Sequence, residues 1–171
     1  MLTVIAIMGI LLAIGIIILL GILEQRRVDA ATNQLVADLR LAHTNATNQL
    51  TDWRVVLVPE KAEDDVPDYY LVKLRASYPN SAPEVTESTP RTFPGNVKIV
   101  NIAGALDTGS GGLVSPSVVG QTRTIEFNTD GTMRFFQAVS GSTCVTVDGD
   151  PENRVIALAA TSRVKIGAGS C

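Results

Sequence analysis

The sequence predicts an α+β fold in which one long N-terminal helix packs on a C-terminal antiparallel β-sheet. The first 50 residues contain no proline, and they pass from an unbroken apolar run to a helical repeat of three to four residues. From residue 53 onward, short runs rich in valine, isoleucine and threonine alternate with turn-forming residues. Because such strands cannot bury a face alone, the sheet should pack on the amphipathic part of the helix.

The first 23 residues are uncharged, and Glu24 is the first charged side chain. A helix of this length is about 35 Å long, enough to cross a hydrocarbon core of about 30 Å. A cleaved secretory signal has a basic start and a shorter apolar part of about 7–15 residues, so it fits poorly. We therefore predict a transmembrane helix over residues 1–23. Arg26 and Arg27 follow it, and by the positive-inside rule they favour a cytoplasmic C-terminal side.

The helix should continue over residues 24–50 as an amphipathic segment. Apolar side chains recur there every three or four residues, at Val28, Ala31, Leu35, Leu39, Ala42 and Ala46. This face is expected to lie against a β-rich globular domain formed by residues 51–171. A chain of 171 residues is long enough to bury a substantial core in one domain.

The β-rich part is expected to hold about seven short strands. The best hairpin signal is TIEFNTDGTMRFF, whose Asp130-Gly131 pair suits a turn that needs positive φ. Four prolines between residues 77 and 95 predict mostly loop there, and the glycine- and serine-rich residues 105–120 predict an exposed loop. The other expected strands are residues 53–59, 69–76, 97–102, 144–147, 154–160 and 163–167.

The net charge of −3 argues against a surface built throughout for nucleic acid. The two cysteines, Cys144 and Cys171, can pair if the domain is exported to an oxidising compartment. The disulfide would close a loop of about 27 residues, worth roughly 3 kcal/mol of stability. The alternative is two free thiols in a reducing compartment.

The stretch VIAIMGILLAIGI at residues 4–16 resembles the N-terminal pattern of type IV pilins and pseudopilins. The segments at 30–49 and 125–131 are similar to those of GspH/FimT-like minor pseudopilins. The resemblance implies a structural subunit of a type II secretion or type IV pilus filament. The same apolar helix would anchor the subunit in the bacterial inner membrane, with its domain on the periplasmic or extracellular side, and then pack with other pilins. The residues that carry the match are Val4, Ile5, Ala6, Ile7, Gly9, Ile10 and Leu11.

The chain departs from the family pattern at its start. In the family, a prepilin peptidase cuts a leader after glycine and methylates the new N-terminus, and a glutamate follows at the fifth mature position. The alignment places Met1 directly after the position of that glutamate. We expect that this sequence starts at an internal methionine of a longer precursor. Genomic sequence without upstream in-frame codons for a Gly-Phe-Thr-Leu-Ile-Glu-like stretch would contradict this expectation.

Enzymatic chemistry finds little support in the sequence. His43 is the single histidine and falls on the predicted helix, where we expect it to be a structural or a surface residue. No catalytic motif is present and no cofactor is predicted. The acidic stretches EDDVPD (63–68) and DGDPEN (148–153) are interpreted as solvated turns, since the second only partly follows a calcium-loop pattern. No metal site is therefore expected.

The C-terminal segment leaves an alternative function open. From Arg154 onward it contains Arg154, Arg163 and Lys165 and no acidic side chain. In the FimT-like branch a Gly-Arg-x-Arg motif is associated with DNA binding in natural transformation, and Ser162-Arg163-Val164-Lys165 matches it only in part. Strand alternation would place Arg163 and Lys165 on one face. These cations leave a DNA-binding minor pilin open as an alternative. A separate alternative is a single-span membrane protein with a sensor-like β domain.

Overall fold

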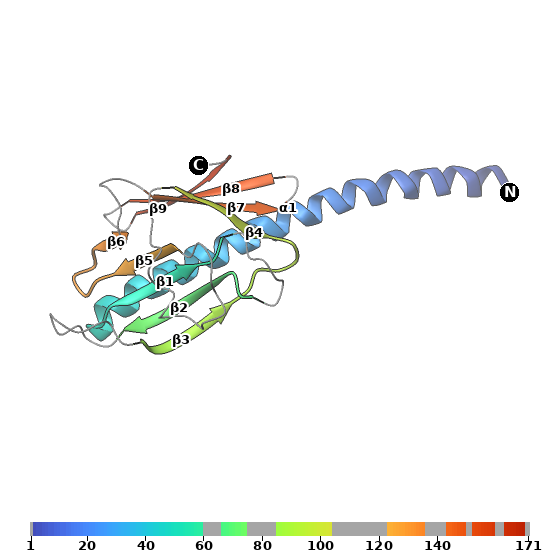
Figure 1. Cartoon of the computed structure of the whole chain (residues 1–171). Coiled ribbons are helices and arrows are strands. Elements are labelled where there is room, and N and C mark those ends of the chain that lie inside the picture. The colour runs from blue at the N-terminus through green and yellow to red at the C-terminus, as the bar shows by residue number, and fades with distance from the viewer. Residues whose placement is uncertain are drawn as a thin grey trace.

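The computed structural model describes residues 2–59, 66–74, 85–103, 123–135, 143–149, 152–159 and 163–169. One helix, α1 (Leu2–Gln49), occupies 48 residues at the N-terminus. Its first half extends away from the strands, and its second half lies among them (Figure 1). The predicted long helix, with a second half packed on the β-rich domain, is confirmed.

The strands form two antiparallel sheets. Sheet A has the order β3-β2-β1-β5-β6 and sheet B the order β4-β7-β8-β9. α1 runs between the two sheets and contacts β1 and β5 of sheet A and β7 and β8 of sheet B (Figure 1). The strands are β1 (Trp53–Leu57), β2 (Tyr69–Leu74), β3 (Val85–Arg91), β4 (Lys98–Ala103), β5 (Arg123–Phe127), β6 (Met133–Phe135), β7 (Thr143–Gly149), β8 (Glu152–Leu158) and β9 (Val164–Ala168).

Strand β3 lies in the segment that the prolines predicted to be mostly loop, so this part of the prediction was wrong. Pro90 is inside β3 and stands opposite Tyr70 of β2. β3 is the outermost strand of sheet A, and a proline without an N–H group is tolerated on an edge strand. The predicted loop at 105–120 lies outside the described residues.

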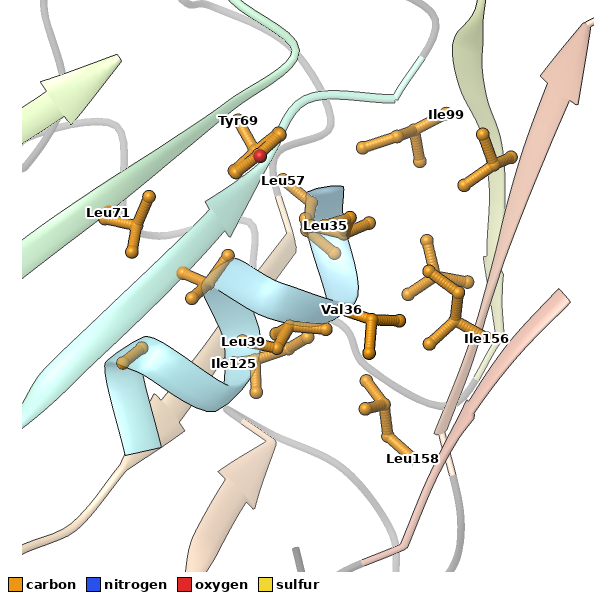
Figure 2. Close-up of a cluster of buried hydrophobic side chains, with 14 of the residues drawn as sticks. Leu35, Val36, Leu39, Leu57, Tyr69, Leu71, Ile99, Ile125, Ile156 and Leu158 are labelled. Carbon is orange, nitrogen blue, oxygen red and sulfur yellow. The ribbon is translucent and has the colours of Figure 1, made fainter. Parts of the chain in front are cut away.

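The main core lies around the second half of α1. All six positions of the predicted apolar face, from Val28 to Ala46, are buried. Figure 2 shows Leu35, Val36 and Leu39 of the helix between side chains of the two sheets. The sheets contribute Leu57, Tyr69, Leu71 and Ile125 from sheet A and Ile99, Ile156 and Leu158 from sheet B.

A second buried cluster lies on the other face of sheet A, away from the helix. It contains Val56, Val58, Tyr70, Val72 and Leu74. Beside it, the Arg54 Nε lies 2.6 Å from the Glu126 carboxylate, and both side chains are buried. These two residues stand directly opposite each other on β1 and β5, so the ion pair joins adjacent strands.

The helix ends at Gln49, and the next residue, Leu50, has a left-handed backbone with φ of 50°. The Thr51 N–H donates to the Ala46 carbonyl over 3.3 Å, the 6→1 hydrogen bond of a Schellman motif. Glycine is the usual residue at this position because it has no Cβ to strain. Leu50 is 71% exposed, so no packing compensates for the strain.

Candidate functional site

The first half of α1 presents large apolar side chains to the surroundings. Those that the structure describes in its first 16 residues are 56–66% exposed, namely Val4, Ile7, Met8, Leu11, Leu12 and Ile16. Contiguous apolar surface of this kind is typical of a site that another molecule or a membrane covers. The sequence named Val4, Ile7, Gly9 and Leu11 for this role, together with Ile5, Ala6 and Ile10, whose side chains lie outside the described ones.

Three glycines interrupt the apolar half, at positions 9, 15 and 21. A Cβ added at Gly9, Gly15 or Gly21 would meet no atom within 4 Å of it. Packing within the described part of the chain therefore gives no reason for a glycine at any of the three. Among the residues that the structure describes, no helix combines the length and the apolar character of a candidate membrane span.

The exposed and buried halves of the helix meet at a short charged segment. Arg27 Nη1 lies 2.9 Å from the Glu24 carboxylate one turn earlier, in an exposed ion pair. From Val28 onward the apolar face is buried. The Arg27 side chain also packs near Gly95, where a Cβ would be 3.5 Å from its Cδ. The surface available to a partner therefore begins on the N-terminal side of Glu24.

A buried polar network holds the second half of the helix on sheet A. The Tyr69 hydroxyl donates to Asp38 Oδ2 over 2.7 Å and accepts a 3.2 Å hydrogen bond from Gln34. Arg91 Nε lies 3.2 Å from the same Asp38 oxygen. Burial, and then the hydrogen bond and negative charge of Asp38, raise the pKa of the Tyr69 hydroxyl well above its usual value. The phenol therefore stays protonated and keeps donating to the helix.

His43 attaches the helix to the β5–β6 hairpin. Its Nε2 lies 3.1 Å from the Gly131 carbonyl, and its ring meets Phe127 edge-on at 5.9 Å. Gly131 has φ of 80°, as expected for the predicted Asp-Gly turn. Through these packing and hydrogen-bonding contacts, His43 has a structural role. Within the described residues, no group of three histidine, cysteine, aspartate or glutamate side chains is placed to hold a metal ion.

The structure separates the three candidate DNA-contact residues. Arg154 lies on the helix side of β8, where its Nε is 2.7 Å from Asp29 Oδ1 on α1. Arg163 immediately precedes β9 and Lys165 lies within it, and both residues are exposed. Lys165 stands opposite Ala157, whereas Arg154 belongs to the alternate set of positions that includes the buried Ile156. Arg163 and Lys165 therefore share the outer face of sheet B, and Arg154 does not.

The cysteines and acidic stretches are described only in part. Cys144 in β7 is disulfide-bonded, and the chain's other cysteine, Cys171, lies outside the described residues, so their pairing stays a prediction.

The first acidic stretch was predicted to be a solvated turn, and for its last residue, Asp68, this prediction was wrong. Asp68 is fully buried, and its Oδ2 accepts a 2.8 Å hydrogen bond from the Phe93 N–H. Its carboxylate therefore helps to fix the segment that follows β3.

Comparison with solved structures shows which fold this is. The chain is similar to the crystal structure of the type IV minor pilin FimU from Pseudomonas aeruginosa, with a TM-score of 0.52 and 12% identity over 86% of this chain and 96% of that chain. The protein has a pilin-like α+β fold. The minor pseudopilin EpsH of the Type 2 Secretion System of Vibrio cholerae is matched with a TM-score of 0.48 and 10% identity, over 83% of this chain and 97% of that chain. No protein-family model and no curated protein matches the chain.

In this pilin-like fold, two surfaces remain as functional candidates. One is the exposed apolar half of α1, and the other is the outer face and edge of sheet B around β9. The sequence named the apolar run and the alternating cations Arg163 and Lys165, because both are local patterns, but it did not show that β9 is an edge strand. It missed the contacts that attach the helix to the sheets, such as Asp38 to Tyr69, since these join residues far apart in the chain.

Proposed function

We propose that the protein is a minor pilin or pseudopilin, a structural subunit that joins a type II secretion or type IV pilus filament through its apolar N-terminal helix. The observation that carries this proposal is the row of large apolar side chains on α1, which are 56–66% exposed from Val4 to Ile16 on a helix that leaves the domain. Leaving this much apolar surface in water is unfavourable by roughly 25 cal/mol for each Å². A cover of similar apolar character is therefore required.

Two successive covers fit the proposal. Before assembly the helix would lie in the bacterial inner membrane, with the domain on the periplasmic or extracellular side. During assembly it would exchange lipid contacts for contacts with equivalent helices of other subunits. Lipid tails are as apolar as the helix, so the exchange depends on close packing rather than on a bulk hydrophobic gain. A full-length precursor would pass through prepilin peptidase, which would cleave and methylate it.

The second half of α1 would have a different task. Its contacts with both sheets transmit the position of the helix to the domain, through Arg154 on one side and Tyr69 on the other. A rigid connection of this kind suits a subunit whose domain must take a fixed place around a helical bundle.

The proposal is tested by placing a charge on the apolar half. We expect Leu11→Asp to reduce cross-linking of the full-length subunit to its filament partners by at least about tenfold, because a carboxylate in an apolar bundle is strongly unfavourable. Asn33→Asp is the matched control, since it adds the same charge at an exposed position of the half that lies on the domain. Equal cross-linking of the two variants would contradict the proposal.

One observation favours DNA binding as a second candidate function. Arg163 and Lys165 are exposed on one face, where both could contact phosphates. We expect that Arg163→Ala and Lys165→Ala each weaken binding of duplex DNA at low salt, whereas Arg154→Ala does not, because Arg154 is bound to Asp29. If DNA binding is unchanged by the first two substitutions, Arg163 and Lys165 do not contribute to it.

A further inference from the structure

Strand β9 is an edge of sheet B that has neither the proline, the very short length nor the register irregularity found at the other sheet edges, although it carries Lys165. At the other edges, β3 contains Pro90, β6 has only 3 residues, and β4 has a register irregularity between Ile99 and Asn101. Each of these features discourages pairing with another chain. β9 has 5 residues, contains no proline and pairs with β8 in a continuous register from Val164 to Ala168. It therefore offers an uninterrupted template for a further strand.

The hydrogen bonds of β9 show which backbone groups face outward. The Ala159 N–H donates to the Arg163 carbonyl, and the Gly169 N–H donates to the Asn153 carbonyl, so odd-numbered residues point toward β8. In an antiparallel pair the intervening residues direct their N–H and C=O groups to the opposite side. Those groups belong to Val164, Ile166 and Ala168. Within the described part of the chain, no hydrogen bond to a further strand satisfies them.

The two faces of β9 differ in character. Arg163 and Lys165 are exposed on the outer face of sheet B. On the helix side, Val164 packs against the core, and Ile166 is 48% exposed although its register partner Ile156 is fully buried. Ile166 is therefore an apolar side chain at the margin of the core that an added strand would cover. An added strand would meet cations on one face and an apolar margin on the other.

Charge decides what kind of strand fits. If two copies of this chain paired through β9, both would bring Arg163 and Lys165 to the same face of the joined sheet. Like charges on adjacent strands are destabilising, whereas opposite charges on adjacent strands are favourable. The edge therefore disfavours a second copy of β9 and favours a strand that carries carboxylates on its outer face.

We propose that β9 binds an extended segment of a partner protein, in which acidic and apolar side chains alternate, as a fifth strand of sheet B. The backbone groups of Val164, Ile166 and Ala168 supply the hydrogen bonds of this strand addition. Arg163 and Lys165 select the acidic side chains, and Ile166 contacts an apolar one. This interaction concerns the edge of sheet B only, and it holds whether or not the N-terminal helix assembles into a filament.

The test uses the full chain in mild detergent and a capped seven-residue peptide in which glutamate and valine alternate. We expect saturable binding and at least about tenfold slower amide hydrogen exchange at Val164, Ile166 and Ala168 in the complex. Ile166→Pro removes one outward N–H and leaves the hydrogen bonds to β8 intact, so it should weaken binding at least about tenfold. Ile166→Val is the matched control and should bind within about twofold of the parent chain.

A charge reversal supplies a second arm, independent of whether Ile166→Pro folds. Lys165→Glu should bind a lysine–valine peptide better than the glutamate–valine peptide, reversing the preference of the parent chain. The proposal is overturned if the acidic peptide shows no binding at about 1 mM, which corresponds to a very weak complex. It is also overturned if Ile166→Pro binds as well as Ile166→Val, or if duplex DNA protects these amides and the acidic peptide does not.

Discussion

Gly149 is the last residue of β7, and we expect its replacement by alanine to destabilise the protein. The residue is buried, and a Cβ built on it would overlap Val28 Cγ2 on α1 and lie 3.3 Å from Val97 Cγ2. Its backbone φ is not positive, so alanine is tolerated by the backbone itself. The effect of the substitution therefore comes from the approach of the helix to the strand.

The expected magnitude follows from two opposing contributions. Glycine within a strand is less stable than alanine by roughly 0.5–1 kcal/mol, which alone would make Gly149→Ala stabilising. Overpacking a core costs about 1–3 kcal/mol, and Val28 is fully buried, so its methyl group cannot turn away into solvent. We expect a net loss of about 1–2 kcal/mol, or a fall in Tm of roughly 2–8 °C for a chain of this size.

A double-mutant cycle with Val28→Ala isolates this contact. Val28→Ala alone should cost about 1.5–3 kcal/mol of unfolding free energy, because it removes a fully buried branched side chain. In the double variant the overlap disappears, so adding Gly149→Ala should then cost nothing or stabilise slightly. Urea unfolding followed by the fluorescence of Trp53, the only tryptophan, measures all four chains. The reasoning is refuted if Gly149→Ala is stabilising alone or costs the same in both backgrounds.

Three further substitutions test the contacts along the helix. Tyr69→Phe should cost about 1.5–3 kcal/mol, since Asp38 loses a hydrogen bond from the phenol. Because the pKa of Tyr69 is raised on folding, the parent chain should lose stability as pH rises above about 10, and urea titrations of Tyr69→Phe should lack this contribution. Arg154→Ala should cost only about 0.5–1 kcal/mol, as its partner Asp29 is 45% exposed; a loss above about 2 kcal/mol would contradict this. Leu50→Gly should raise the unfolding free energy by about 1 kcal/mol, and a lower Tm would contradict the strain at this position.

The parts of the fold that follow local patterns were predictable. The helix could be predicted through Gln49 because no proline interrupts it, and its core face because Val28, Leu35 and Leu39 keep a helical spacing. Strand β3 was missed because the sequence shows its prolines but not that the strand lies at an edge, where Pro90 is tolerated.

Buried polar residues were missed for a related reason. Asp38 belongs to the polar side of the helical repeat, yet it is buried because Tyr69 and Arg91 reach it from sheet A. The partners that make this burial favourable come from more than 30 residues further along the chain, so local spacing carries no signal of them. The division of the strands into two sheets depends on such distant contacts as well.

The register of β8 with β9 determines how many cations a polyanion would meet. A slip of β9 by one residue would move Arg163 and Lys165 to the face that holds Arg154, but it would also turn Val164, which packs against the core, to the outer face. Of the three cations counted in the sequence, a polyanion on the outer face of β8 and β9 would thus meet Arg163 and Lys165 but not Arg154. For duplex DNA the logarithm of affinity should fall with the logarithm of salt concentration with a slope near −1.8 from these residues, compared with about −2.7 for three. A steeper slope that is reduced by Arg154→Ala would contradict this placement.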